Sequence, residues 1–394
     1  MALLQALKRL FRPSAAPSAP PPKSSAPAWV PLLRDPKRDS ARARLLIFAD
    51  GPGATQVISF ALPLKALRDD GALDLMVVNE TDFDGLTPVA AERGVAAVFE
   101  DFNPTHVTVS RCAGLGAVGM IKACEARGLS YVMHLDDNLF AVPPELGPAK
   151  YKKYSSSERL NRLRLLCERA GKIYVSTKPL REQIAAMDFS PPVIAGDIYC
   201  AAAASMKPPH FGGAPVFGYM GTAGHADDLD MIAPAIERAL AENPQATFET
   251  FGTIKAPSAL KRKFGERIRE RQAAGSYLEF IEAFKAMNWR CGLAPLRDTL
   301  FNACKANTKF IEYTVAGIPV VASDSEVYRS IAAGGRGALA AGTDAWAAAI
   351  GRFLADDEGA MQSVQRAQDY VSDHYDMDAL VRQVVEVLEL PVRR

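Results

Sequence analysis

The fold of this chain is constrained most by a regular alternation of short apolar runs and amphipathic helical segments, which begins at Arg44. Strands that alternate with helices form βαβ units, and these units build a parallel sheet. We therefore predict an α/β protein with a doubly wound architecture. The expected strands are residues 45–49, 73–78, 105–109, 131–134 and 172–175, followed by 216–219, 247–251, 291–294 and 318–322. The main expected helices are residues 115–126, 157–170 and 229–241.

The alternation is interrupted once, at residues 195–213, where alanine, proline and glycine accumulate. A chain of 394 residues exceeds what a single hydrophobic core usually serves, so this interruption indicates a linker between two domains. The sequence predicts an N-terminal arm at residues 1–40, a first domain at 41–200, a second domain at 214–375 and a terminal helix at 376–394.

Charge and cysteine usage exclude several classes of protein. Charged residues make up 23% of the chain and the formal net charge is +1, which gives no electrostatic footprint for nucleic acid. The six cysteines show no CxxC spacing, which argues against a zinc site and a disulfide framework and fits a reducing cytoplasm. No run approaches the roughly 18 apolar residues of a membrane span. We expect a cytoplasmic protein without a metal or other cofactor.

The arm at residues 1–40 is basic, with seven Lys and Arg against two Asp. Residues 1–12 are a candidate amphipathic helix, and residues 13–31 are dominated by Pro, Ala and Ser, which is typical of an extended tether. Apolar burial and basic side chains together favour peripheral contact with an anionic surface, such as the inner face of the plasma membrane. An unstructured leader without a role fits the same residues, and the sequence leaves both interpretations open.

The most informative motif lies between Gly292 and Asp324. A short apolar strand runs into a polar loop that contains Asn302, and the helix that follows surrounds a single acid, Glu312, with apolar residues. Gly317 is placed to end that helix, because glycine takes the left-handed backbone conformation without steric cost. Functional groups thus cluster at the carboxyl end of the first strand, which is where open α/β sheets bind ligands.

This stretch resembles the nucleotide-sugar site of retaining GT-B glycosyltransferases of the group 1, family 4-like type. In that family a helix carries Glu-x7-Glu and ends in Gly-x-Pro-Val-Val-Ala. Here Glu312 and the segment from Gly317 to Ala322 match the second half of the pattern. The position of the first Glu is occupied by Cys304.

The resemblance implies a donor site in the second domain. Glu312 is expected to hold the ribose hydroxyls of the nucleotide, a task that suits a carboxylate with two acceptor oxygens. Asn302, Lys305 and Lys309 are similar to a Phe-Asn and Lys pattern in one subgroup of the family. These lysines are expected to supply the positive charge that a departing nucleoside diphosphate needs, although one of the two also fits a solvated surface.

Two loops with small residues follow the first strand of each domain. Gly51 and Gly53 allow close backbone approach to a phosphate or a sugar, and a tight βα turn is the alternative explanation. The turn that contains Gly221 and Thr222 resembles the family's phosphate-contacting turn. We expect all four residues to bind substrate.

Polar residues also follow two strands of the first domain. His134, Asp136 and Asp137 come at the end of one strand, where carboxylates can orient acceptor hydroxyls, or where one of the acids can simply cap a turn. We expect His134 and Asp136 to act in catalysis and Asp137 to bind substrate. Arg111 ends a neighbouring strand and fits either a diphosphate or acidic ligand group, or an ordinary surface arginine.

The resemblance implies the GT-B architecture, in which two Rossmann-like, doubly wound domains face each other across a cleft and a terminal helix, here 376–394, braces the first domain. The implied function is transfer of a sugar, with retention, from a nucleoside-diphosphate donor to a glycan, lipid-linked or protein acceptor in polysaccharide or glycoconjugate synthesis. Two alternatives remain: a non-catalytic binding or scaffold subunit, which Cys304 favours, and a nucleotide-sugar epimerase of the same fold.

Overall fold

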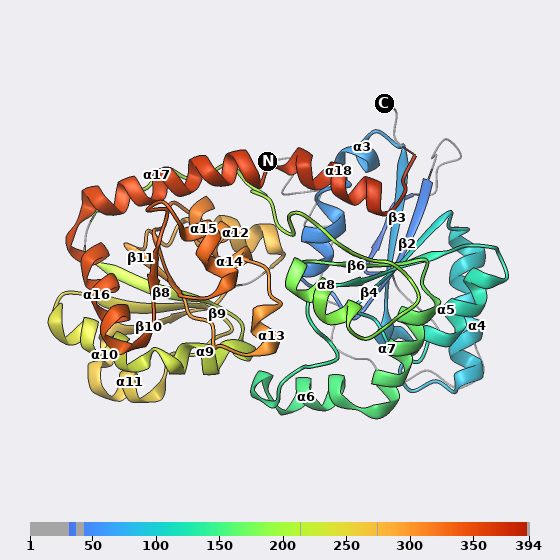
Figure 1. Ribbon diagram of the computed structural model, residues 1–394, viewed down its shortest axis with the longest axis horizontal. Coiled ribbons are helices and arrows are strands. Elements are labelled where there is room, and N and C mark those ends of the chain that lie inside the picture. The colour runs from blue at the N-terminus through green and yellow to red at the C-terminus, as the bar shows by residue number, and fades with distance from the viewer. Residues whose placement is uncertain (1–30, 37–42, 213, 274, 392–394) are drawn as a thin grey trace. The chain divides into compact units, whose positions relative to one another are not determined.

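The computed structural model describes residues 31–36, 43–212, 214–273 and 275–391. The amphipathic segment predicted at residues 1–12 lies outside these ranges. The chain divides into two compact units (Figure 1). Unit 1 contains the described residues up to Val142, residues Ala149–Tyr199 and the described residues from Asp378 onward, whereas unit 2 contains Pro143–Pro148 and Cys200–Met377.

Unit 1 is built on a seven-stranded sheet in the order β1-β3-β2-β4-β5-β6-β7. All neighbouring strands are parallel except β1, which pairs antiparallel with β3 at the edge. The strand order reverses direction between β2 and β4, and the carboxyl ends of these two strands form the topological switch point of the sheet. The strands are Leu33–Arg34 (β1), Ala43–Ala49 (β2), Leu73–Asn79 (β3), His106–Ser110 (β4), Tyr131–Leu135 (β5), Lys172–Val175 (β6) and Val193–Ala195 (β7).

The helices of unit 1 pack on this sheet, and α4, α5 and α7 lie next to one another (Figure 1). Local sequence explains where they begin: the Thr87 hydroxyl caps α4 and Pro88 occupies its first turn. Asn103 ends α4 in the left-handed conformation. The helices are Ala54–Gln56 (α2), a π-helical turn at Val57–Ala61 (η1), Lys65–Asp69 (α3), Pro88–Phe102 (α4), Ala117–Glu125 (α5), Pro148–Ser155 (α6), Ser157–Arg169 (α7) and Lys178–Ala185 (α8), with a short 3-10 turn at Glu80–Phe83 (η2).

The terminal helix α18 (Met377–Val387) returns to unit 1. The side-chain oxygen of Gln383 accepts hydrogen bonds from the backbone N–H groups of Asp197 (2.6 Å) and Ile198 (3.1 Å), and its amide nitrogen donates to the Tyr174 hydroxyl (2.6 Å). Residues far apart in the sequence therefore complete unit 1.

Unit 2 contains an entirely parallel six-stranded sheet in the order β10-β9-β8-β11-β12-β13. Numbered from its own first strand, this is the order 3-2-1-4-5-6 of dinucleotide-binding folds, with the switch point between β8 and β11. The strands are Val216–Gly221 (β8), Thr247–Gly252 (β9), Ile268–Arg271 (β10), Cys291–Ala294 (β11), Val320–Ser323 (β12) and Ala338–Ala340 (β13).

The prediction of one continuous helix in unit 2 is wrong. The expected helix at 229–241 is split into α9 (Ala226–Met231) and α10 (Ala233–Glu242). Pro234 explains the break, because proline lacks the N–H that a continuous helix would need and is tolerated in a first turn. The other helices are Ala223–His225 (η4, 3-10), Ser258–Phe264 (α11), Gly265–Arg267 (η5, 3-10), Tyr277–Lys285 (α12), Leu300–Ala303 (α13), Thr308–Val315 (α14), Glu326–Ala332 (α15), Gly342–Ala355 (α16) and Asp357–His374 (α17), with Pro144–Leu146 (η3, 3-10) in the short segment of this unit.

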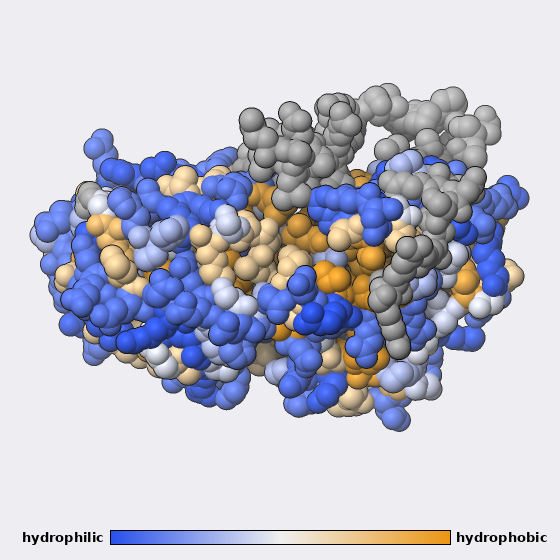
Figure 2. All heavy atoms as spheres, turned by 90° about the horizontal axis from the view of Figure 1, so that it is seen from above, coloured by the Kyte–Doolittle hydropathy of each residue, from blue (hydrophilic) through white to orange (hydrophobic). Residues whose placement is uncertain are grey.

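The core of unit 2 consists of aromatic and aliphatic side chains from the sheet and from α10 and α16. By contrast, the face of unit 2 that carries α17 is mainly hydrophilic in Figure 2. Within the described part of the chain, no helix combines the length and the apolar character needed to cross a bilayer.

Candidate functional site

The switch point of unit 2 is lined by loops that follow β8 and β11 and by the first turns of α14. Ligands of open α/β sheets bind outside the carboxyl ends of the strands at such a point. The turn that ends α14 fixes the position of this helix. Gly317 in that turn has a φ of 71°, and a Cβ atom there would lie 2.7 Å from the carbonyl oxygen of Lys207. Only glycine fits this turn, as the sequence motif predicts.

Lys309 and Glu312 lie one turn apart on α14. The Nζ of Lys309 donates a 2.6 Å hydrogen bond to the carbonyl oxygen of Met220, at the end of β8, and lies 4.6 Å from the centre of the Tyr219 ring. Burial lowers the pKa of Lys309 despite the nearby Glu312. Burial likewise raises the pKa of Glu312, although Lys309 and the Tyr277 hydroxyl favour its ionised form. Burial therefore disfavours the charge on both groups, while each group favours the charged form of the other.

The predicted Gly221 is the last residue of β8, and Thr222 follows it in the loop. A Cβ atom on Gly221 would lie 3.2 Å from a Tyr219 ring carbon and 3.5 Å from the Nζ of Lys309, so this position is crowded. Thr222 is exposed and directly precedes η4. The structure thus places Gly221 beside Lys309, with Thr222 next in the chain.

The loop after β11 holds Asn302 and Lys305, and it contains the short helix α13 that the sequence analysis did not anticipate. The Asn302 side chain is buried and donates to the carbonyl oxygen of Arg297 (3.0 Å) and to a carboxylate oxygen of Asp228 (3.3 Å), so it holds the loop together. The Nζ of Lys305 lies 5.2 Å from the centre of the Phe301 ring. Cys304, which replaces the family's first Glu, is buried.

Asp228 is a residue of this site that sequence reasoning missed. It lies in α9 and is 5% exposed, and its carboxylate approaches the ring of His225 as well as the loop after β11. Burial tends to raise the pKa of Asp228, but hydrogen bonds from His225 and from the Arg297 backbone outweigh it, and the pKa is lowered. The spacing of three residues between His225 and Asp228 is a local signal that could have found the pair.

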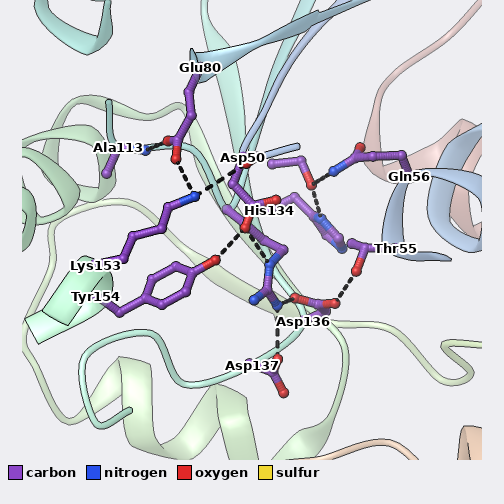
Figure 3. Close-up of polar contacts among 12 residues, drawn as sticks. Asp50, Thr55, Gln56, Glu80, Ala113, His134, Asp136, Asp137, Lys153 and Tyr154 are labelled. Atoms are coloured by element: carbon purple, nitrogen blue, oxygen red, sulfur yellow. Dashed lines mark hydrogen bonds and ion pairs between the residues drawn. The ribbon is translucent and has the colours of Figure 1, made fainter. Parts of the chain in front are cut away.

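Unit 1 has a different cluster at its own switch point, where Asp50, Asp136 and Asp137 come together (Figure 3) around the side chain of Arg111. Arg111 has a φ of 57°, which is uncommon for a residue other than glycine. Its guanidinium binds three carboxylates: Asp50 (3.0 Å), Asp137 (2.9 Å) and Asp136. Burial tends to lower the pKa of Arg111, but these three acids raise it well above its usual value. The arginine charge is therefore matched within the protein.

Further hydrogen bonds fix two of these acids. Asp136 accepts from the hydroxyls of Thr55 (2.6 Å) and Tyr199 (3.0 Å), and Asp50 accepts from the Tyr154 hydroxyl (2.6 Å). Burial tends to raise the pKa of Asp136, yet the charge of Arg111 and the hydrogen bond from Thr55 outweigh it, so the pKa lies below its usual value. Asp137 is the most exposed of the three acids, at 27%.

His134 is completely buried inside the sheet. Its Nδ1 lies 2.9 Å from the Ser110 hydroxyl, and Gln56 donates to that same hydroxyl at 3.1 Å. The ring packs edge-on against Phe60 at 5.1 Å, and burial lowers the pKa of His134 to about 4. His134 is therefore neutral and belongs to the packed interior of unit 1.

Glu80 and Arg159 form a buried ion pair that also escaped the sequence analysis. Arg159 donates to the carbonyl oxygen of Arg111 (3.0 Å), and Glu80 accepts from the backbone N–H of Ala113 (2.9 Å). Lys153 approaches Glu80 from α6 at 2.8 Å (Figure 3). This pair holds the backbone at Arg111 and at Ala113, two residues further on, and thereby supports the left-handed conformation of Arg111.

The glycine loop of unit 1 lies beside this cluster. A Cβ atom on Gly51 or Gly53 would meet nothing within 4 Å, so both positions are open. The α-helical segment that follows is only three residues long before it becomes π-helical. Among the described residues, no group of three His, Cys, Asp or Glu side chains is arranged to hold a metal ion.

Comparison with known proteins bears on the fold. No protein-family model matches the chain, and no curated protein matches it. The structure of Anabaena HepE in complex with UDP-glucose matches with a TM-score of 0.60 and 15% identity, over 88% of this chain and 99% of HepE. UDP-forming α,α-trehalose-phosphate synthase from Burkholderia xenovorans matches with a TM-score of 0.57 and 12% identity, over 88% of this chain and 99% of the synthase.

A third match is S. aureus TarM in complex with fondaparinux and UDP, with a TM-score of 0.56 and 12% identity, over 76% of this chain and 58% of TarM. These matches agree with the two parallel-sheet units described above. The chain has the mixed α/β fold of the GT-B glycosyltransferases.

Proposed function

We propose that this chain transfers a sugar from a nucleoside-diphosphate donor to an acceptor hydroxyl. The observation that carries the proposal is the pairing of Lys309 and Glu312 on α14, beside the switch point of a sheet with the 3-2-1-4-5-6 order. A buried ammonium group suits a diphosphate, and a carboxylate one turn away suits the ribose hydroxyls. HepE, which has a similar fold, is known in complex with UDP-glucose, and this supports a UDP-sugar donor.

The lysines would act in the chemical step as well as in binding. Negative charge builds up on the diphosphate as its bond to the sugar breaks, and fixed positive groups at that position stabilise it. Lys309 and Lys305 supply such groups. We therefore propose that no metal or other cofactor is needed, and we expect turnover to persist in excess EDTA. Retention at the anomeric carbon and a hexosyl donor belong to the same proposal and rest on the sequence resemblance.

The acceptor would bind at unit 1. Asp137 is held by Arg111 through one carboxylate oxygen and is partly exposed, so it can accept a hydrogen bond from an acceptor hydroxyl. Asp136 and Arg111 are expected to position it, because both are held by hydrogen bonds and ion pairs to other residues of unit 1. Since TarM was captured with fondaparinux, a glycan is the acceptor class with most support, ahead of a lipid-linked or protein acceptor.

Calorimetric and thermal-shift titrations with UDP, GDP, ADP and dTDP test the donor site. We expect one nucleotide, UDP first, to bind and stabilise the wild type, and we expect Glu312→Ala to lose that response. Lys263→Met, which removes an exposed cation of α11, is the control and should respond as wild type does. If no nucleotide binds at millimolar concentration, the donor proposal fails and a scaffold subunit becomes the better account.

Product analysis separates the enzymatic alternatives. A transferase releases free nucleotide faster when a suitable acceptor is present, whereas an epimerase converts UDP-N-acetylglucosamine without an acceptor. The proposed cytoplasmic location, with peripheral contact through residues 1–12, is tested separately. The full chain and a chain without these residues would be sedimented with vesicles that contain anionic lipid.

A further inference from the structure

His225 and Asp228 lie at the switch point of unit 2 but have no part in the function proposed so far. His225 is the last residue of η4, directly after the loop that follows β8, and Asp228 follows in α9. The Nδ1 of His225 lies 3.1 Å from a carboxylate oxygen of Asp228. An imidazole that is held at one nitrogen presents its second nitrogen in a fixed direction.

Asp228 is itself fixed from the other side of the switch point. Its second carboxylate oxygen accepts hydrogen bonds from the backbone N–H of Arg297 (3.0 Å) and from the Asn302 side chain (3.3 Å). One buried carboxylate therefore joins the loop after β8 to the loop after β11. The position of the His225 ring is set by both loops that border the proposed diphosphate position.

The second ring nitrogen of His225 is available to a ligand. No hydrogen bond joins Nε2 to any other residue that the structure describes, and the side chain is 27% exposed. This differs from His134, whose ring is enclosed in the core of unit 1. Charged groups near His225 are Asp228, which holds its ring, and Lys305 and Lys309, which are the cations proposed to stabilise a bound diphosphate.

We propose that His225, held by Asp228, is a further diphosphate-binding residue that donates a hydrogen bond from Nε2 to a phosphate oxygen and takes up one proton from solvent as the ligand binds. This inference rests on the proposed function and adds a group that the sequence motif does not contain.

The proton uptake follows from the protonation state of His225 before a ligand binds. Burial and the two lysines lower the pKa of His225 to about 4, although Asp228 acts to raise it. The ring is then neutral, with its proton on Nδ1 toward Asp228 and a lone pair on Nε2. The negative charge of a bound diphosphate raises this pKa, so that a proton from solvent adds to Nε2 and completes the donor.

Isothermal titration calorimetry of UDP, performed at about pH 6 in buffers of different ionisation enthalpy, measures the number of protons taken up. We expect the wild type to take up more protons per bound UDP than His225→Gln. We also expect His225→Gln to bind UDP about tenfold more weakly, because a hydrogen bond to a charged group is lost. Raising the pH should weaken UDP binding to the wild type more than to the variant.

Two further variants complete the experiment. Asp228→Asn can still accept from Arg297 and Asn302 but removes the charge beside His225, so we expect proton uptake to decrease as well. His374→Gln, which alters an exposed histidine of α17, should behave as wild type does. If His225→Gln keeps wild-type affinity and proton uptake, the inference is wrong while the donor site stands. If the wild type binds no nucleoside diphosphate, the proposed function itself fails.

Discussion

The two switch points of this protein occupy the same place in their sheets but use charge in opposite ways. In unit 1, Arg111 is surrounded by Asp50, Asp136 and Asp137, and a second ion pair, Glu80 with Arg159, holds the backbone around it. In unit 2, the Nζ of Lys309 has a carbonyl oxygen and an aromatic ring as neighbours, and no carboxylate of the described residues lies within ion-pair distance of it.

We interpret this difference as a structural role for the charges of unit 1 and, in line with the proposed function, a ligand-binding role for the charge of Lys309 in unit 2. A buried cation with three carboxylate partners is already neutralised, so it contributes to the fold and has little capacity for an anionic ligand. A buried lysine whose pKa is lowered is held in an unfavourable environment, and an anionic ligand relieves it. The comparison therefore supports the proposal that the nucleotide binds to unit 2 and that an acceptor with hydroxyl groups binds to unit 1.

The largest expected effect is on the stability of unit 1. Arg111→Met leaves three carboxylates, two of them largely buried, without their cation, and removal of one partner from a buried ion pair costs roughly 3–5 kcal/mol. Urea denaturation measures this loss in the free energy of unfolding. Far-UV circular dichroism follows both units, whereas the buried Trp289 and Trp346 report on unit 2. We expect the circular-dichroism transition to shift to lower urea concentration.

The matched control is Arg34→Met, which removes an exposed arginine that pairs with Asp101 in the same unit. Exposed ion pairs contribute about 0–1 kcal/mol, so this variant should unfold almost as wild type does. If the two variants unfold alike, the Arg111 cluster is not what stabilises the switch point of unit 1.

In contrast to Arg111→Met, Lys309→Met should affect ligand binding more than stability. We expect the free energy of unfolding to change by less than about 1 kcal/mol, because the charge that is removed was already disfavoured by burial. UDP binding should weaken by about 2 to 3 kcal/mol, since a hydrogen bond to a charged phosphate is lost. Calorimetric titration measures the affinity, with Lys263→Met as the control. Unchanged UDP affinity would remove Lys309 from the donor site.

Acid should weaken unit 1 through Asp136. Because the folded-state pKa of Asp136 is below its unfolded value, this group stabilises the fold above the unfolded pKa, near 3.8, and the stabilisation is lost as the pH falls through the lower folded pKa. The effect is about 2 kcal/mol for a group of this kind. Unfolding measured between about pH 5 and pH 2 should show a smaller loss in Asp136→Asn than in the wild type. An equal loss in both proteins contradicts this role.

The smallest expected effect concerns the glycine loop of unit 1. Gly53 has an extended backbone conformation, with a φ of −174°, and a Cβ atom there meets nothing. Gly53→Ala should therefore change the free energy of unfolding by no more than about 0.5 kcal/mol. It should leave the affinity for UDP unchanged. A large loss of UDP affinity in this variant would place a phosphate at unit 1 and overturn the comparison.

The sequence contained enough to predict the fold and the helix of the proposed donor site. The alternation of strands and helices gives the parallel sheets, and Gly317, which ends the helix that carries Glu312, has the left-handed conformation expected of it. Both signals are local, because periodicity and turn chemistry act between residues close in the chain. The break at Pro234 was also a local signal, but it was missed.

The partners of Arg111 could not be read from sequence in the same way. They follow β2 and β5, which are the two neighbours of β4 in the sheet. The sequence does not give this strand order, so it does not show that these residues lie close together. His134 shows the same limit. Beside Asp136 it resembled an acid–base group, but strand register pairs it with Ser110 and Tyr174 in the interior of the sheet. Long-range pairing decides which polar residues are buried, and a single sequence does not specify it.

Hydrogen exchange with and without saturating UDP tests the central claim most directly. The account predicts slower exchange of backbone amides at residues 219–225 and 302–315 of unit 2, and unchanged exchange at residues 50–56 and 110–113 of unit 1. Slower exchange confined to the two segments of unit 1 would contradict it, because the nucleotide would then bind at the switch point that the protein fills with its own charges.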